Sequence, residues 1–131
     1  MPYPWAMATS ATDPPPHPQR RELIDFAVSL PEAWEDFPWG ESAAKVKKKV
    51  FAFFGVEGAG TLKLCVKLPA SGQAALELRE AELAGYGLGK SGWVVFEYGP
   101  DETADMDQLR DWVMESFCAV APKKLAALVM E

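Results

Sequence analysis

Two runs of sequence decide the fold, KVKKKVFAFF at residues 45–54 and TLKLCVKL at residues 61–68. In the second run every other residue from Leu62 to Leu68 is aliphatic, and this period of two is typical of a strand with one buried face. The first run has a similar period, with Val46, Val50 and Ala52 expected to face inward. Residues 57–60, EGAG, form a turn between the runs. The middle of the chain is therefore predicted to be an antiparallel strand pair.

Helical patterns flank this strand pair on both sides. Apolar residues at helical spacing predict a first helix from Leu23 to Leu30, which Pro31 ends. Residues 31–41 are interpreted as a loop, and Ser71 is predicted to cap a short helix. Residues 93–98 are predicted to form a further strand after a glycine-rich loop at residues 85–92.

A long C-terminal helix completes the pattern. Asp105 or Asp107 can cap it, and Pro122 begins a last helical segment. Its predicted buried stripe is Leu109, Trp112, Val113, Ser116, Phe117 and Val120. The order of elements predicts an α+β fold, with a single antiparallel sheet and helices packed on one face. The tryptophans expected in the core or at its edge are Trp34, Trp39, Trp93 and Trp112.

The N-terminal segment differs in composition from the rest. Residues 1–18 contain six of the eleven prolines, together with the single histidine, His17. Proline at this density removes backbone donors and blocks helix formation. We predict a flexible Pro-rich arm over residues 1–18 and one domain over residues 19–131, a length that suits a single core. The arm is interpreted either as a leader without a role or as a docking ligand.

The charge of the chain is unevenly distributed. The net charge is -6 and the pI is about 4.8, which argues against a generally basic nucleic-acid-binding protein. Residues 45–90, however, contain eight bases and four acids. Cys65 and Cys118 are far apart and are expected to be free thiols in a reducing cytoplasm. No run of 18 apolar residues and no signal peptide is present, so we expect no membrane association.

The outer face of the predicted sheet is the first candidate binding surface. Lysines interleaved with aromatic rings are typical of single-strand nucleic-acid platforms, because the cations meet phosphates and the rings stack on bases. The predicted outward residues are Lys45, Lys47, Lys49, Phe51, Phe53, Lys63, Cys65 and Lys67, with Lys90 in the glycine-rich loop as a further anion contact. Two alternatives stay open: a loop, the arm or a second chain covers the rings, or a β-bulge buries them.

Several short motifs in order resemble one family. They are Glu35-x-x-Pro38-Trp39-Gly40, Lys45-Val46, Lys49-Val50-Phe51-Ala52, Leu62-Lys63-Leu64 with Pro69, Gly89-Lys90 before Trp93-Val94, and Ser116-Phe117. Over roughly residues 19–131 the chain resembles the MmcQ/YjbR family of small bacterial proteins. The resemblance implies a CyaY-like fold, and members are commonly labelled DNA-binding without a settled biochemical role. Gly92 and Phe117 depart from the polar residue and the tyrosine usual in the family.

Other function classes have weaker support in the sequence. With His17 in the arm, no histidine-based catalysis is expected in the domain, and we predict neither an enzyme nor a cofactor. Acids near residues 32–41 and 101–107 are explained by helix capping. The leading hypothesis is a binding module for DNA or RNA. The alternatives are a protein or homodimer contact through Phe51, Phe53 and Trp39, and a small-ligand or metal binder by fold analogy.

Overall fold

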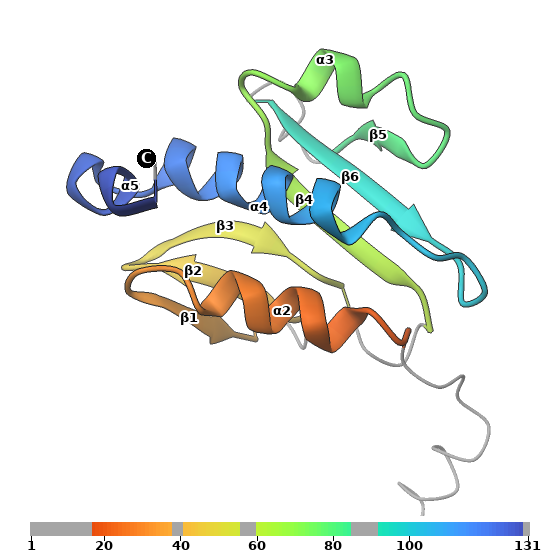
Figure 1. Ribbon diagram of the computed structural model, residues 1–131, viewed down its shortest axis with the longest axis horizontal. Coiled ribbons are helices and arrows are strands. Elements are labelled where there is room, and N and C mark those ends of the chain that lie inside the picture. Colours follow the sequence, from red (N-terminus) through yellow and green to blue (C-terminus); the bar gives the residue numbers. More distant parts are fainter. Residues whose placement is uncertain (1–16, 38–40, 56–59, 85–91, 130–131) are drawn as a thin grey trace, which may run out of the picture.

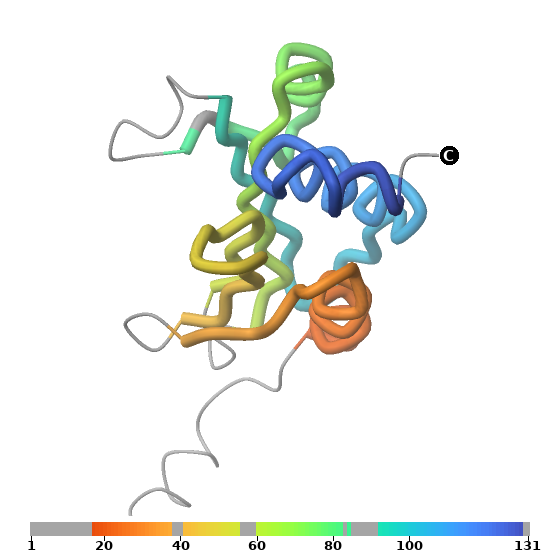
Figure 2. The backbone as a smooth tube through the Cα atoms, turned by 90° about the vertical axis from the view of Figure 1, so that its left-hand side faces the viewer, coloured from red at the N-terminus to blue at the C-terminus, as the bar shows by residue number. Residues whose placement is uncertain are grey.

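The structure is a computed structural model that describes residues 17–37, 41–55, 60–84 and 92–129 of the 131-residue chain. One antiparallel sheet has the strand order β1-β2-β3-β4-β6-β5, and the long helices lie against one of its faces (Figures 1 and 2). The elements are α2 (Arg20–Val28), β1 (Ala33–Asp36), β2 (Ala43–Val46), β3 (Lys49–Phe53), β4 (Leu62–Lys67), α3 (Gly72–Ala75), β5 (Ala81–Leu83), β6 (Trp93–Tyr98), α4 (Met106–Val120) and α5 (Lys123–Val129). The predicted α+β fold is confirmed. None of the described helices is long and apolar enough to cross a membrane.

The core lies between the sheet and the helix layer. α4 packs on β3 and β4, while α2 packs on β1 and β2. The aliphatic residues of β4 are fully buried on this face, as the alternation predicted. Trp112 of α4 stacks on Phe96 of β6, with ring centroids 4.1 Å apart and planes 14° from parallel. The predicted stripe of α4 therefore faces the sheet, with Leu109, Val113 and Phe117 fully buried.

A β-bulge between β2 and β3 corrects the prediction for Phe51. Ala44 pairs with Ala52 but Lys45 pairs with Val50, so Phe51 is the extra residue on β3. The bulge turns Phe51 toward the helices, where its fully buried ring meets the edge of the Phe117 ring at 5.2 Å between centroids. The prediction that Phe51 faces outward is therefore wrong, and so is that for Lys49, which lies opposite inward-facing Val46 on the helix side of the sheet. Val50, expected inward, instead shares the outer face with Lys45.

A serine from α4 joins β3 and β4 where their ladder ends. The hydroxyl of Ser116 donates to the carbonyl of Phe51 at 2.5 Å and accepts from the backbone N–H of Lys67 at 2.8 Å. Ser116 is fully buried, so these contacts satisfy backbone groups that water does not reach. The sequence placed Ser116 on the buried stripe but did not predict this bridge.

The folded domain begins earlier than predicted. His17, assigned above to the flexible arm, is only 3% exposed. Its Nδ1 accepts the backbone N–H of Gln19 at 3.1 Å, so Nε2 carries the proton that is donated to the carbonyl of Glu102 at 2.8 Å. The Gln19 side chain also pairs with the backbone of Ala104 through two hydrogen bonds. His17 is thus part of the folded domain.

The segment expected to be a loop at residues 31–41 contains the edge strand β1. It follows a tight turn in which Glu32 has a φ of +58°. Trp34 on β1 is 43% exposed, so its predicted place in or near the core is wrong, whereas Trp93 and Trp112 are buried as expected. A four-residue strand of sequence AWED has too short a pattern to be recognised.

The helix ends agree in part with the predicted caps. The carboxylate of Asp105 accepts the N–H of Gln108 at 3.3 Å, so Asp105 is the cap of α4. α5 follows Pro122 directly, as predicted. Ser71 does precede α3, but its hydroxyl donates to Glu115 of α4 instead of capping the helix.

Candidate functional site

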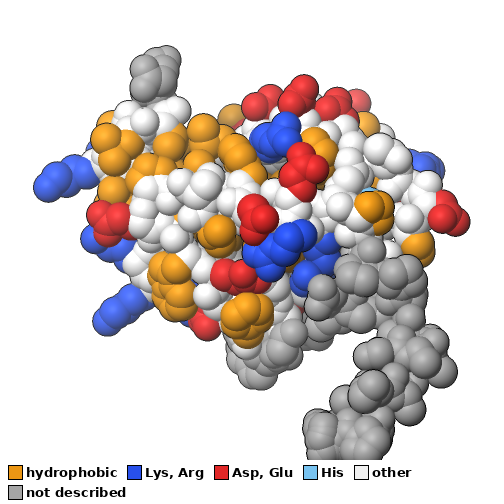
Figure 3. Space-filling view, turned by 60° about the horizontal axis from the view of Figure 1, so that its bottom comes forward, with side chains coloured by type: hydrophobic (Ala, Val, Ile, Leu, Met, Phe, Trp, Pro, Cys, Tyr) orange, Lys and Arg blue, Asp and Glu red, His pale blue; other side chains and the backbone are white. Residues whose placement is uncertain are grey.

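Lysines from two segments far apart in the sequence meet at one end of the sheet. Lys47 and Lys48 form the turn between β2 and β3, Lys49 begins β3, and Lys123 and Lys124 begin α5. α5 and the β2–β3 turn lie at the same end of the molecule in Figure 1, and basic side chains protrude from this end in Figure 3. These five lysines are called the lysine end below.

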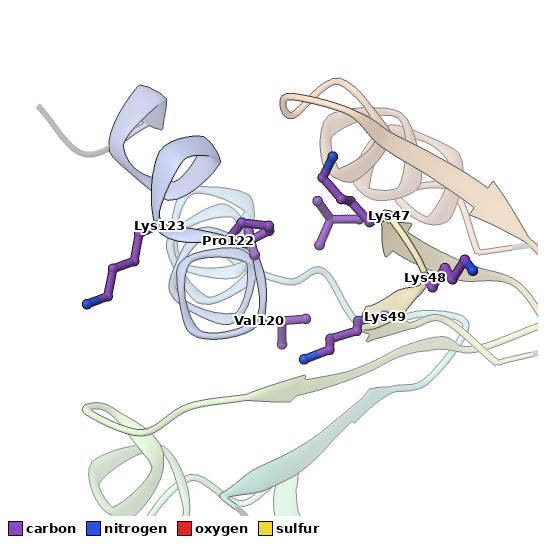
Figure 4. A pocket seen from close by; sticks show the side chains of 8 residues that line it. Lys47, Lys48, Lys49, Val120, Pro122 and Lys123 are labelled. Carbon is purple, nitrogen blue, oxygen red and sulfur yellow. The ribbon is translucent and has the colours of Figure 1, made fainter.

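The lysine end encloses a groove of about 520 Å³. The residues lining it are Val46, Lys47, Lys48, Lys49, Val120, Ala121, Pro122 and Lys123. In Figure 4 the Lys49 side chain extends toward Val120, whereas Lys48 and Lys123 point outward on opposite sides. Aliphatic and proline side chains thus form the wall of the groove, and ammonium groups form its rim.

Most charges of the lysine end are not matched by acids. Among the described residues, Lys48, Lys49, Lys123 and Lys124 form no ion pair with an acid. Lys47 pairs with Glu32 at 3.3 Å, but both side chains are more than half exposed and such a pair contributes little stability. Positive potential is therefore concentrated here, although the whole chain is acidic.

A purely structural explanation accounts for some of this charge. α4 ends at Val120, beside the groove, and cations near a helix C-terminus interact favourably with its dipole. The dipole effect falls off within the last turn of the helix, so it accounts only for cations close to the helix end. Five lysines on two segments are more than this effect accounts for.

Backbone strain singles out Lys47 within the group. Its φ is +57°, in the left-handed region that glycine and asparagine adopt much more readily. A lysine at the tip of a two-residue hairpin turn has a conformational cost on the order of 1 kcal/mol. Residues held in such conformations often occur at functional sites.

The other predicted lysines on the sheet lie apart from this groove. Lys45 forms an ion pair with Asp36 at 2.7 Å, and this hydrogen bond lowers the pKa of the Asp36 carboxyl. Lys63 and Lys67 are half-exposed on the outer face of β4, where Lys63 lies opposite Glu97 of β6. The structure therefore does not bring all the predicted lysines into one surface.

The predicted aromatic platform does not form as expected. Phe51 is in the core, and the half-buried ring of Phe53 packs against Trp93 at 5.8 Å between centroids. Cys65 lies in the same outer-face cluster, and burial raises the pKa of its thiol to about 12. A thiol protonated at neutral pH is a poor nucleophile. The remaining predicted residues, Lys90 and Trp39, lie outside the described residues.

Groups that support catalysis or metal binding are scarce in the described part of the chain. Within residues 17–37, 41–55, 60–84 and 92–129, no three His, Cys, Asp or Glu side chains gather to hold a metal ion. Both ring nitrogens of His17 are engaged by the backbone. This arrangement assigns His17 to the structure of the domain.

Lys48, Lys123, Lys124 and Trp34 were absent from the predicted site. Lys48 was missed because strict alternation in KVKKKVFAFF treats it as inward-facing. The pair Lys123-Lys124 directly after Pro122 is a sequence signal for a basic helix start, but only the packing of α4 brings it to the hairpin. Trp34 was missed because the strand that carries it was interpreted as a loop.

Comparisons with known proteins are consistent with this fold. The chain matches the family model named YjbR over residues 28–119, a range that includes the hairpin lysines and ends before Lys123. It is similar to the crystal structure of Deinococcus radiodurans protein DR2400, described as a DUF419 domain, with a TM-score of 0.61 and 23% identity over 79% of each chain. At this identity the likeness shows the fold alone. A comparison with curated proteins gives no match.

Proposed function

The chain belongs to the YjbR family, and we propose that it is a non-enzymatic binding module that contacts nucleic-acid phosphates through the lysine end. The observation that carries this proposal is the groove lined by Lys47, Lys48, Lys49 and Lys123, whose charges are largely unmatched among the described residues. Phosphate contacts by lysine release condensed counterions, which supplies sequence-independent affinity.

The acidic net charge limits what this surface can do. Acids elsewhere on the molecule repel the same phosphates, so binding is expected to be modest and confined to the lysine end. Lysine is a flexible point charge, so such a surface recognises the backbone and not the base sequence. We therefore expect weak affinity with no strong sequence preference.

The alternative of a contact through exposed aromatic rings has less support. Of the three residues invoked for it, Phe51 is fully buried and Phe53 packs on Trp93. Trp39 lies outside the described residues. Of the residues invoked for this contact, Phe53 is the one that stays partly exposed in the part of the chain that the structure describes.

Fluorescence anisotropy with a labelled 12-nucleotide oligothymidine and a 12-base-pair duplex tests the proposal. Four phosphate contacts predict a log–log slope of affinity against salt of roughly -3 on the single strand, since each contact contributes about -0.7. The variant Lys48→Ala/Lys49→Ala should reduce that slope to roughly -1.4 and weaken binding. The matched control Lys63→Ala/Arg79→Ala removes the same charge away from the groove and should leave both values unchanged.

Two results would overturn the proposal. One is the absence of binding to either nucleic acid at about 50 mM salt, where phosphate contacts are strong. The other is an equal loss in the control and the Lys48→Ala/Lys49→Ala variant, which would assign the affinity to overall charge. Retained binding by Lys48→Ala/Lys49→Ala with loss in the control would transfer the site to the surface that carries Lys63 or Arg79.

A further inference from the structure

An exposed tryptophan lies directly beside the lysine end. Trp34 on the edge strand β1 is 43% exposed, whereas Trp93 and Trp112 are 8% and 6% exposed. Its indole Nε1–H donates to the carbonyl of Lys47 at 2.9 Å. The ring is therefore attached to the tip of the same hairpin that forms the groove.

The position of the Trp34 ring is held from two sides. The hydrogen bond to Lys47 satisfies the only polar group of the indole, and the ammonium of Lys45 lies 5.4 Å from the ring centroid, within the range of a cation–π contact. Lys45 is itself held by Asp36 at 2.7 Å. An aromatic ring ordered before binding loses little conformational entropy when a flat ligand stacks on it.

The charges around Trp34 favour an anionic ligand. Lys45 lies opposite Trp34 in the β1–β2 ladder, and Lys47 and Lys48 form the turn to which the indole is hydrogen-bonded. The acids nearest Trp34 in the sequence are all paired: Glu32 with Lys47, Asp36 with Lys45, and Glu35 with Arg21 of α2 on the other face of the sheet. Among the described residues Lys48 forms no ion pair, so its charge is left over at the turn beside the ring, whereas Lys49 lies opposite inward-facing Val46 and extends from the other face of the sheet.

We infer that the nucleic acid bound at the lysine end is single-stranded, with an unpaired base stacked on Trp34 while its neighbouring phosphates meet the hairpin lysines. This inference rests on the proposed function and names its substrate class. A base inside a duplex has both faces covered by its neighbours, whereas an unpaired base presents a free face to an aromatic side chain. Stacking of this kind is tolerant of sequence, in keeping with lysine contacts to the backbone.

The test compares the 12-nucleotide oligothymidine, an oligouridine of equal length and the 12-base-pair duplex. Trp34→Leu keeps an apolar side chain but removes the stacking face, and should weaken single-strand binding by about 5- to 150-fold. Duplex binding should stay unchanged. Trp34→Phe keeps a smaller ring without the hydrogen bond to Lys47 and should show an intermediate loss. The difference between the two single strands measures the joint effect of the ribose 2′-hydroxyl and the thymine methyl group on binding.

Phe37→Ala is the matched control. Phe37 is 62% exposed and follows β1 at the end of the strand away from the hairpin turn. Removing its ring should leave binding to all three nucleic acids unchanged. Thermal melting of each variant checks that the domain still folds. If Trp34→Leu does not fold, binding by Trp34→Phe is compared with binding by the wild type instead.

The outcomes separate this inference from the proposal on which it rests. Wild-type single-strand affinity in Trp34→Leu, or in Trp34→Phe if only that variant folds, would overturn stacking while phosphate binding by the lysine end stands. A wild-type preference for the duplex would overturn it as well. Equal losses in Phe37→Ala and Trp34→Leu would assign the effect to exposed rings in general and contradict a specific contact. No binding to any of the three would overturn both statements.

Discussion

The two ends of α4 carry opposite charge, and the charged side chains have different roles at each end. The helix begins among Asp101, Glu102, Asp105, Asp107 and Asp111 and ends beside the lysine end. Both arrangements complement the helix dipole, which favours anions at the N-terminus and cations at the C-terminus. Charge alone therefore does not distinguish a structural end from a binding end.

The acidic end uses its carboxylates to hold the fold. Glu102 accepts the backbone N–H of Gly99 at 2.6 Å and pairs with Arg79 at 3.0 Å. Asp105 caps the helix, whereas the exposed pairs of Asp107 with Arg110 and of Glu102 with Arg79 contribute little stability. The ammonium groups of the lysine end make no comparable contact with the described residues, apart from the exposed Lys47–Glu32 pair. A charged side chain is available to a binding partner when it has no ion-pair partner within the protein.

The comparison requires α4 to be firmly docked, and Trp112 tests this. Trp112 lies midway along the helix and stacks on Phe96. Trp112→Ala should destabilise the protein by about 3–5 kcal/mol, because a large cavity replaces the ring. Denaturant titration measures the change. Leu128→Ala, at a side chain that is 63% exposed, should change stability by less than about 0.5 kcal/mol. A near-normal midpoint for Trp112→Ala would show that Trp112 does not dock α4 on the sheet.

Ser116 tests whether the framework of the lysine end depends on α4. Ser116→Ala leaves the carbonyl of Phe51 and the N–H of Lys67 without their partner, at an expected cost of about 2–4 kcal/mol. Ser29→Ala is the control, since Ser29 is exposed and its hydroxyl donates only to the carbonyl of Phe26 among the described contacts. Urea titration should separate the two variants clearly. Equal midpoints would mean that β3 and β4 stay joined without the hydroxyl.

Because the acidic end stabilises the fold and the lysine end does not, we expect a substitution at the acidic end to cost more stability. Asp105→Ala removes the helix cap and should cost about 1 kcal/mol. Lys48→Ala/Lys49→Ala should change stability by less than about 0.5 kcal/mol, because exposed lysines without an ion pair contribute little. Both variants can be compared in one urea series. A larger loss in the lysine variant than in Asp105→Ala would reverse the assignment of the structural and the binding end.

The smallest expected effect concerns pH at the acidic end. The Gly99 N–H and then Arg79 lower the pKa of Glu102 from its ordinary value of 4.5. A carboxyl with a lowered folded pKa adds stability above about pH 4.5 and loses it as the pH falls through the folded value. Glu102→Gln should therefore lower stability at neutral pH and approach the wild type in acid. Parallel curves from pH 7 to pH 3 would contradict this.

Much of the fold could be predicted because the patterns were long. The eight-residue alternation around β4 and the stripe of α4 each repeat several times, so their buried faces were assigned correctly. The short strand β1 and the bulge in β3 were not predicted. β1 has too few residues to show a pattern, and one extra residue in β3 moves the residues before it to the opposite face of the sheet. His17 was assigned to the wrong region because burial by a distant loop leaves no local pattern.

The candidate site depended more on tertiary structure than the fold did. The sequence by itself determined an α+β domain of the YjbR family and a surplus of lysine in its middle third. Only the tertiary structure decided that Lys123 and Lys124 join the hairpin, that Trp34 on the edge strand stays exposed beside Lys47 and that the bulge turns Phe51 inward. The physical reason is range: alternation and capping act between residues a few positions apart, whereas the groove joins segments separated by more than half the chain.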